Sequence, residues 1–403
     1  MTSALSDLEP SHVDASLAAD GAERVAWAAS NMPVLAGLRD EFARDRPLAG
    51  RRIGMCLHVE MKTAVLVGVL RAGGAEIVWT GSPSTTDDAV AAAMAADGVV
   101  VYSRRADTFD DHLRHVERVL ASDPDLLLDN GADLIAAAVE GRASRVTAAT
   151  EETTSGRNRL LGELAERVPF PVVVINDSPI KLLFENEHGI GPAVVDGFMR
   201  ATNSLIAGKT MAVAGYGSCG RSLARTLRAL GAVVIVAEPD PVRALEAAFD
   251  GMRVATLTRA AGLADALFTV TGRPGVVRGG DLLELRDGAM LANVGHFGNE
   301  IAVDELEALA TERRRVAADV VAYRLPNGRT VRLLAGGEML NLAAATGHQM
   351  QIMDLGFALQ AHSMRELVLR PEQFAPGYQP VPPEIDRAVA AEALGTLSSI
   401  ELG

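Results

Sequence analysis

The stretch VAGYGSCGRSLARTLRALGAVVIVAEPDP, residues 213–241, decides the fold of this chain. An apolar run leads into a loop with the spacing Gly-x-Gly-x-x-Gly, whose glycines are Gly215, Gly217 and Gly220. A segment with apolar residues at helical spacing follows, and a second apolar run then ends at Glu238. This order of strand, turn, helix and strand predicts a Rossmann unit, with the loop against the pyrophosphate of a dinucleotide.

The acid at the end of the second strand predicts which dinucleotide binds. Glu238 can accept hydrogen bonds from both hydroxyls of the adenosine ribose. The same carboxylate would repel the additional phosphate of NADP. The sequence therefore predicts NAD as the cofactor.

Composition limits the class of protein. A chain of 403 residues exceeds one ordinary core, so two domains are expected. The formal net charge of −14 argues against a nucleic-acid surface, which would be basic. Two distant cysteines suggest neither a disulfide framework nor a metal site. With neither an apolar leader nor an apolar run of membrane length, the chain is interpreted as cytoplasmic, without membrane contact.

The glycine loop begins past the middle of the chain, so a large unit precedes it. Alternating strand and helix patterns run through that first part, and residues 350–370 form one long apolar helix pattern. The predicted fold class is α/β, with two doubly wound domains and a hinge between them. The substrate domain is expected over 1–190, completed by 346–380, the Rossmann NAD-binding domain over 191–345, and a C-terminal tail over 381–403.

Several segments, in this order, resemble those of the S-adenosylhomocysteine hydrolase family. They are CLHVEMKTAVL (56–66), STTDD (84–88), LDNGADL (128–134), EETTSG (151–156), VINDSPIKLLFENEHG (174–189), DGFMRATNSLIAGK (196–209), VAGYG (213–217), NVGHFGNEI (293–301) and NLAAATGH (341–348). The resemblance covers roughly residues 25–370. It implies a two-domain enzyme, usually a homotetramer, that holds NAD tightly and acts on a small nucleoside; a homo-oligomer, dimer or tetramer, is therefore expected.

The resemblance also implies a reaction. The family oxidises the 3′-hydroxyl of its substrate to a ketone, which makes the C4′ hydrogen acidic enough to remove. The 5′ substituent then leaves, water adds, and the ketone is reduced again.

Residue roles follow from the same resemblance. His58 matches a general acid/base near the 5′ position, although a histidine at a strand end can also be an ordinary core residue. Lys181 matches the base for the 3′-hydroxyl, Asn186 helps to orient it, and Glu152 holds the ribose hydroxyls. The predicted cofactor contacts at the nicotinamide side are Thr153, Thr154, Ser155 and Asn341. His296 and His348 match histidines at the nicotinamide end and the substrate gate.

The chain departs from the family pattern at positions on the reacting side. Asn130 stands where the family has an acid/base aspartate, and an amide cannot take up a proton at neutral pH. Glu185 replaces an aspartate, and Thr86 replaces a glutamine. Glu60 and Lys62 replace the threonine and glutamate that commonly read the adenine edge, a pairing found in some bacterial and archaeal members. All five positions are included in the predicted site.

The clustered changes favour an altered reaction. The leading hypothesis is dehydration of a 5′-hydroxyl to give a 4′,5′-unsaturated purine nucleoside, as in angustmycin-type antibiotic pathways. One alternative is hydrolysis of S-adenosyl-L-homocysteine to adenosine and homocysteine. The other is an NAD-binding regulatory pseudoenzyme.

Overall fold

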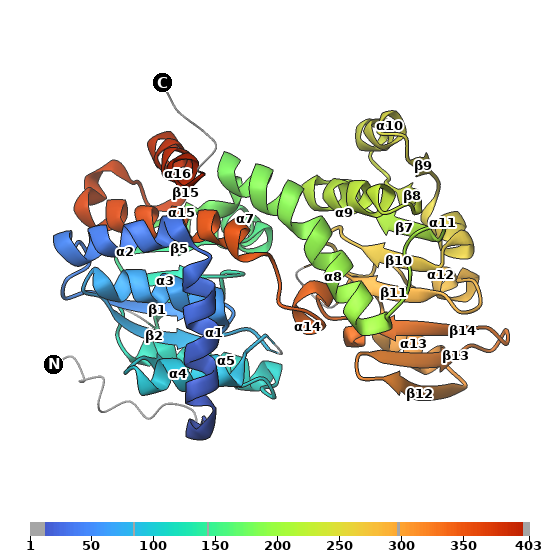
Figure 1. The fold of residues 1–403 in the computed structure, drawn as a ribbon, viewed down its shortest axis with the longest axis horizontal. Helices are drawn as coiled ribbons and strands as arrows, with labels where there is room; N and C mark the ends of the chain where they lie inside the picture. Colours follow the sequence, from blue (N-terminus) through green and yellow to red (C-terminus); the bar gives the residue numbers. More distant parts are fainter. Residues whose placement is uncertain (1–12, 84, 143–144, 296–298, 398–403) are drawn as a thin grey trace. The chain divides into compact units, whose positions relative to one another are not determined.

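The computed structural model describes residues 13–83, 85–142, 145–295 and 299–397. The chain divides into two compact units: unit 1 comprises residues 1–182 and 350–403, and unit 2 comprises residues 183–349. Each unit has a largely or wholly parallel sheet with helices packed against it (Figure 1). The predicted α/β fold with two doubly wound sheets is therefore confirmed.

Unit 1 contains a seven-stranded sheet in the order β15-β6-β5-β4-β1-β2-β3, and every pair of neighbouring strands is parallel. Its strands are β1 (Arg52–Cys56), β2 (Glu76–Thr80), β3 (Val100–Val101), β4 (Leu126–Asp129), β5 (Ala148–Glu151), β6 (Pro171–Val174) and β15 (Gly377–Pro380). The strand order reverses at β1, which has β2 on one side and β4 on the other. Ligands bind at such a switch point, beyond the carboxyl ends of the strands.

The helices of unit 1 come from both ends of the chain. They are α1 (Ala18–Ser30), α2 (Pro33–Asp45), α3 (Met61–Ala72), α4 (Asp88–Ala96), α5 (Phe109–Ala121), α6 (Asp133–Ala137), α7 (Thr154–Leu161), α15 (Met350–Leu369) and α16 (Pro383–Thr396). Apolar residues recur at helical spacing across residues 23–42, and this pattern alone predicts one helix. The structure has two helices there, because Pro33 lacks the N–H of a helix interior and stands at the first position of α2. Strands β5 and β15 were not predicted from the sequence.

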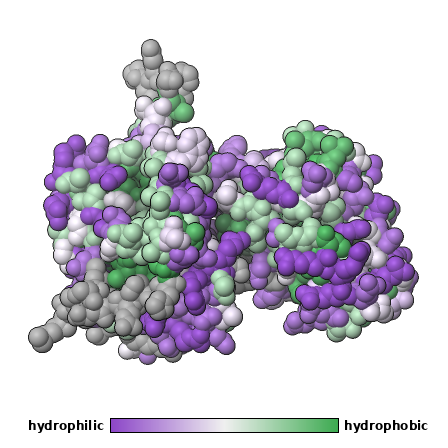
Figure 2. Space-filling model, turned by 60° about the horizontal axis from the view of Figure 1, so that its bottom comes forward, coloured by the Kyte–Doolittle hydropathy of each residue, from purple (hydrophilic) through white to green (hydrophobic). Residues whose placement is uncertain are grey.

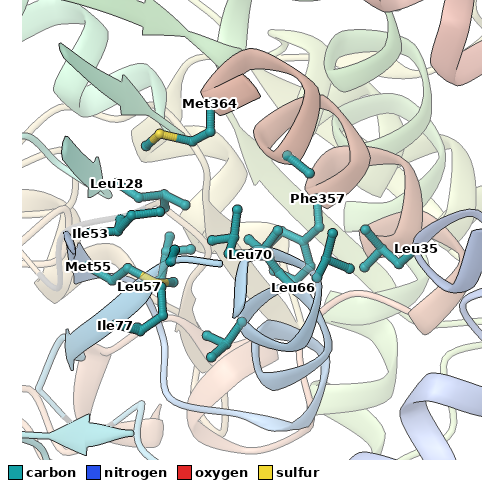
Figure 3. Close-up of a cluster of buried hydrophobic side chains, with 14 of the residues drawn as sticks. Leu35, Ile53, Met55, Leu57, Leu66, Leu70, Ile77, Leu128, Phe357 and Met364 are labelled. Atoms are coloured by element: carbon teal, nitrogen blue, oxygen red, sulfur yellow. The ribbon is translucent and has the colours of Figure 1, made fainter. Parts of the chain in front are cut away.

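Apolar side chains of unit 1 bury both faces of its sheet. Ile53 and Met55 of β1 belong to one cluster and Cys56 to another, as the alternation of a strand requires. Helix α15 supplies Phe357, which lies beside side chains of α2 and α3 in the first cluster (Figure 3). A helix from the far end of the sequence therefore completes the core that the first part of the chain begins.

Unit 2 contains an eight-stranded sheet in the order β12-β13-β14-β11-β10-β7-β8-β9. Its strands are β7 (Thr210–Ala214), β8 (Val233–Ala237), β9 (Arg253–Val254), β10 (Ala266–Thr269), β11 (Met290–Asn293), β12 (Glu312–Ala317), β13 (Val320–Arg324) and β14 (Thr330–Leu334). Strand β13 is antiparallel to both of its neighbours, and the other pairs are parallel. The order reverses at β7, which leads into the glycine loop.

The helices of unit 2 are α8 (Ile190–Thr202), α9 (Ser218–Ala229), α10 (Pro241–Phe249), α11 (Leu257–Leu263), α12 (Gly280–Glu284), α13 (Val303–Leu309) and α14 (Leu340–Ala343). A π-helical segment, η5 (Lys181–Gly189), precedes α8 and carries the chain from unit 1 into unit 2.

Hydrophilic residues cover much of the face drawn in Figure 2, with hydrophobic residues between them. Among the described residues, no helix combines the length and the apolar character needed to cross a membrane.

Candidate active site

Unit 1 gathers polar side chains where its strand order reverses. His58 follows β1, and Asn130 follows the neighbouring strand β4. The Asn130 Nδ2 atom lies 3.5 Å from His58 Nε2, a long contact in which the amide can only donate. The predicted pair is therefore adjacent, and of its two members only His58 can exchange a proton near neutral pH.

A buried ion pair lies on the other side of β4. Lys181 Nζ lies 2.6 Å from Glu152 Oε1, and both side chains are almost fully buried, with relative exposures of 5% and 6%. Glu152 follows β5, while Lys181 is the first residue of η5. Gln360 of α15 donates a hydrogen bond to the other carboxylate oxygen, Glu152 Oε2. The two residues predicted to hold and deprotonate the ribose hydroxyls therefore contact each other directly.

Two further buried carboxylates shape the strand ends that carry these residues. Glu151 accepts hydrogen bonds from the backbone N–H groups of Gly131, Ala132 and Thr153. Asp129 accepts from the backbone N–H of Asn130 and of Ile135. Complete burial raises the pKa of both carboxyls. Repulsion by Asp133 adds to the rise at Asp129 and repulsion by Asp129 adds to it at Glu151, while the amide hydrogen bonds oppose it.

Glu60 and Lys62, the residues predicted to contact the purine edge, form a second ion pair. Glu60 caps α3 by accepting from the backbone N–H groups of Lys62 and Thr63. The Lys62 ammonium lies 2.7 Å from Glu60 Oε2 and is almost fully buried. Lys62 is therefore held in a defined place at the start of α3, a few residues after His58.

Other predicted residues of unit 1 hold local structure. The Thr86 hydroxyl is fully buried and lies 2.6 Å from Ser103 Oγ. Thr153 caps α7 and contacts Ser155 Oγ at 2.8 Å, while Thr154 donates to Asn176. The hydroxyls predicted to meet the nicotinamide side of NAD thus also have partners within unit 1.

The glycine loop of unit 2 has the geometry that a dinucleotide requires. Gly215 has a φ of 106°, and a Cβ atom there would lie 2.8 Å from the carbonyl oxygen of Val270. A Cβ atom at Gly220 would lie 2.1 Å from the Gly215 carbonyl oxygen. Helix α9 begins directly after Gly217 without a side-chain cap, so its first N–H groups are available to an anion.

A cavity of about 1070 Å³ opens beside this loop, entirely within unit 2, and Gly215, Gly217 and Glu238 line it. The Glu238 carboxylate accepts from the backbone N–H groups of Tyr216, at 2.7 Å, and Asp240, at 2.9 Å. These bonds fix its orientation and leave acceptor positions for two ribose hydroxyls. The loop, the uncapped helix and the acid together fit NAD.

The remaining predicted residues lie in unit 2 or outside the described residues. Glu185 is buried and Asn186 half-buried on η5, and Asn341 is buried on α14. His348 is half-buried at the end of unit 2. His296 lies outside the described residues. These roles stay predictions.

Comparison with known proteins decides the family. The sequence profile of the S-adenosyl-L-homocysteine hydrolase family matches residues 11–146, and that of its NAD-binding domain matches residues 186–347. The chain belongs to the S-adenosyl-L-homocysteine hydrolase family. NAD is accordingly its cofactor.

Three relatives of this hydrolase family are similar over nearly their whole length. The S-inosyl-L-homocysteine hydrolase of Methanopyrus kandleri is 47% identical, covering 96% of this chain and 93% of the relative. The adenosylhomocysteinases of Sulfolobus acidocaldarius and Aquifex aeolicus are 43% and 41% identical, each covering 95% of this chain and 93% of the relative. Among solved structures, a dipicolinate synthase from Bacillus halodurans is 14% identical with a TM-score of 0.49, covering 80% of this chain and 99% of that one.

The expected dehydration of a 5′-hydroxyl is wrong. The similar hydrolase-family proteins are named for hydrolysis of an S-nucleosylhomocysteine, which favours the hydrolase alternative. The expectation failed because the residue types at positions 86 and 130 do not by themselves specify the leaving group. In the structure the Thr86 hydroxyl contacts Ser103 and Asn130 lies beside His58.

Sequence reasoning missed three residues that lie at the candidate site. Glu151 was quoted within EETTSG without a role, although it holds both strand-end turns. Gln360 lies within the segment interpreted as an apolar helix. A glutamine in the middle of a buried helix indicates that its amide has a hydrogen-bond partner in the core. Arg243 lines the cavity, and its Nη1 lies 3.8 Å from the place that a Gly217 Cβ atom would take.

Proposed function

We propose that this chain hydrolyses the thioether between C5′ of a purine nucleoside and the sulfur of homocysteine, with S-adenosyl-L-homocysteine as the first candidate substrate. The observation that carries the proposal is the buried Lys181–Glu152 pair at the strand ends of unit 1. Burying an ion pair costs desolvation free energy and is a poor way to stabilise a fold. A catalytic use explains the pair better in a chain whose similar relatives are such hydrolases.

Lys181 and Glu152 divide the handling of the ribose between them. Glu152 accepts hydrogen bonds from ribose hydroxyls, which orients the sugar. Lys181 takes the proton of the 3′-hydroxyl and returns it at the end of the cycle. NAD, when bound, supplies the hydride acceptor that turns the 3′-alcohol into a ketone.

His58 transfers the protons of the elimination and of the addition of water. Once C3′ is a ketone, the imidazole takes the C4′ proton and delivers it to the sulfur as the C5′–S bond breaks. It then takes a proton from the water that adds to C5′ and returns it to C4′. Asn130 donates to the imidazole or to the water and exchanges no proton itself. The proposal therefore assigns to a single histidine the proton transfers that the family pattern divides between two groups.

A thiol assay tests the proposal. The purified chain with NAD is incubated with S-adenosyl-L-homocysteine, and free thiol and adenosine are quantified. Release of both in equal amounts is expected. No thiol release from any S-nucleosylhomocysteine contradicts the proposal.

Replacing Lys181 tests its role. Lys181→Ala is expected to lower turnover by about 10²- to 10⁴-fold, the usual contribution of a positioned acid or base. NAD binding should persist, because Lys181 lies in unit 1 and the glycine loop in unit 2. Lys209→Ala, at the turn before β7, is the matched control and should leave turnover unchanged. Equal activity of the two variants would remove Lys181 from the mechanism.

One observation favours a second candidate, S-inosyl-L-homocysteine. Lys62 occupies a position that, by the family resemblance, faces the purine edge, and its ammonium can only donate hydrogen bonds. Hypoxanthine presents a carbonyl oxygen at C6, whereas adenine presents an amino group that also donates. The relative from Methanopyrus kandleri acts, by its name, on the inosyl compound.

The two substrates are compared by kcat/KM in the wild type and in Lys62→Met. If Lys62 reads a C6 oxygen, the wild type prefers the inosyl compound and the variant loses that preference by about 10-fold or more, the cost of leaving a hydrogen-bonding group unpaired. An unchanged ratio in the variant would show that Lys62 does not read C6, and a wild-type preference for the adenosyl compound would exclude the second candidate.

Oligomeric state stays a prediction, which light scattering of the purified protein measures.

A further inference from the structure

The Glu152 carboxylate is held from two directions by groups that are distant in sequence. Lys181 Nζ donates to Oε1 at 2.6 Å, and Gln360 Nε2 donates to Oε2. Gln360 has a relative exposure of 0%, so no solvent competes for its amide. The carboxylate thus has one charged and one uncharged donor, each on its own oxygen.

The backbone that carries Gln360 is firmly placed. Phe357 precedes it by one turn of α15 and Met364 follows it by one turn, and both belong to the large apolar cluster of unit 1 (Figure 3). Asp354, near the start of the same helix, accepts hydrogen bonds from the backbone N–H groups of Val34 and Leu35 at 2.9 Å. Because α15 is anchored on both sides of Gln360, its amide has little freedom to leave Glu152.

The amide is satisfied on one side only. Its Oε1 atom is buried and finds no hydrogen-bond partner among the described residues. An apolar side chain of similar volume would remove that cost, which is about 1–3 kcal/mol for a buried polar group left unpaired. Rotating the amide by 180° would point its oxygen at the carboxylate, so the charge of Glu152 fixes its orientation.

We propose that Gln360 is a positioning residue for the reaction: it holds Glu152 against Lys181 with an uncharged donor, and so sets the pH range in which Lys181 can take the 3′-hydroxyl proton. This inference rests on the proposed function, because it assumes that Lys181 acts as a base. An uncharged donor is the suitable choice. A second carboxylate at this place would stabilise the protonated ammonium, and a cation would compete with Lys181 for Glu152.

Two substitutions test the role. Gln360→Met keeps the approximate volume and removes the donor. Gln360→Glu keeps the shape and adds a negative charge beside Glu152. The matched control is Ser363→Ala, because Ser363 lies one turn further along α15, is also fully buried, and has a hydroxyl without a partner among the described residues.

The readout is the pH dependence of a single half-reaction. Full-length protein loaded with NAD is mixed with adenosine, and reduction of the bound nicotinamide is followed by its absorbance between pH 5.5 and 9.5. In Gln360→Glu the acid limb of the rate profile is expected to move up by about one pH unit, because the added carboxylate stabilises the protonated lysine. In Gln360→Met the rate at the optimum is expected to fall about 10-fold, while the thermal midpoint stays within a few degrees of the wild type.

The outcomes separate this inference from the function on which it rests. A wild-type protein that releases no homocysteine overturns the proposed function. A wild-type protein that hydrolyses its substrate, with both Gln360 variants retaining the wild-type rate and profile, overturns only the role of Gln360. Losses no larger than those of Ser363→Ala also overturn it. If Gln360→Glu does not fold, Gln360→Met decides by its rate at the optimum, since that variant removes the unpaired oxygen and is the better tolerated.

Discussion

Three carboxylates lie at the ends of the neighbouring strands β4 and β5: Asp129, Glu151 and Glu152. They have different hydrogen-bond partners, and the partners determine the role of each. Asp129 and Glu151 accept backbone N–H groups, so they hold turns in place. Glu152, one residue further, instead receives the Lys181 ammonium. A carboxylate that accepts hydrogen bonds from backbone amides holds the backbone in place. A carboxylate paired with a buried lysine can instead influence the proton affinity of that lysine.

Arg243 provides a test at the scale of one residue. Its Nη1 atom lies 3.8 Å from the position that a Gly217 Cβ atom would take. In Rossmann proteins the backbone approaches the pyrophosphate at this glycine. Arg243→Ala is expected to weaken binding of NAD and of ADP-ribose by about 10-fold or more, the worth of a hydrogen bond to a charged group. The thermal midpoint of the cofactor-free protein should not change. Calorimetric titration with ADP-ribose, together with thermal unfolding of the cofactor-free variant, distinguishes a phosphate contact from general damage to unit 2.

The first turn of α7 is confined by Glu151. A Cβ atom added at Gly156 would lie 2.1 Å from the Glu151 Cδ atom, inside the contact distance of any two atoms. Gly156→Ala is therefore expected to destabilise the protein by about 1–3 kcal/mol, as overpacked cores do. Urea unfolding measures the change.

Gly37 of α2 is the matched control for that substitution. A Cβ atom at Gly37 meets nothing within 4 Å. Gly37→Ala should stabilise the protein by about 0.5–1 kcal/mol, because alanine loses less conformational entropy than glycine in a helix. If both alanines had the same effect, the contact with Glu151 would not limit Gly156.

The contact between α15 and α2 depends on the ionisation of Asp354. Burial raises the pKa of this carboxyl to about 6, against the opposing effect of hydrogen bonds from the N–H groups of Leu35 and Val34. A pKa above that of the unfolded chain means that the folded protein binds the proton more tightly. The stability that this proton contributes is therefore present at low pH and is lost as the pH rises through about 6.

Asp354→Asn removes the titrating carboxyl, so the variant is the reference against which the wild type is compared. Between pH 5 and pH 7.5 the free energy of unfolding of the wild type should fall by about 1.4 kcal/mol relative to the variant, the equivalent of one pKa unit. Urea unfolding at several pH values measures the difference. A constant difference across this range would show that Asp354 does not titrate there.

At the scale of the whole molecule, the predicted cofactor-binding residues of the glycine loop and the predicted proton-transfer groups belong to different units. The loop and cavity for NAD lie within unit 2, and the Lys181–Glu152 pair lies within unit 1. NAD added to the cofactor-free protein should therefore protect backbone amides of 214–220 and 237–243 from hydrogen exchange. The interior strands of the unit 1 sheet should exchange as before. Protection confined to unit 1 would contradict the placement of the cofactor.

NAD should also raise the thermal midpoint of unfolding. At a concentration of about 100 times the dissociation constant, binding to the folded state alone adds about 2.7 kcal/mol. NADP at the same concentration should have a smaller effect, because Glu238 repels the additional phosphate. Equal shifts with both dinucleotides would contradict that assignment of Glu238.

Local patterns predicted much of this architecture. The Rossmann unit was predictable because the glycine loop, the helix and the acid at Glu238 lie within 29 consecutive residues, where spacing translates directly into geometry. Strand β15 was not, because a four-residue segment that ends in Pro380, with Pro376, Pro382 and Pro383 beside it, joins the sheet only by pairing with β6. Helices α1 and α2 were merged into one pattern, since apolar periodicity continues across the break before Pro33.

The sequence by itself determined the family and the cofactor, because both are encoded in short segments that keep their order along the chain, and the roles of the site residues stay predictions. It did not determine the reaction: the changes at Thr86, Asn130 and Glu185 suggested dehydration, which the similarity to hydrolases overturned. Only the tertiary structure placed Gln360 on Glu152, across 208 positions of sequence. Such a contact depends on how α15 packs back into the core of unit 1, and no local pattern records the packing of distant segments.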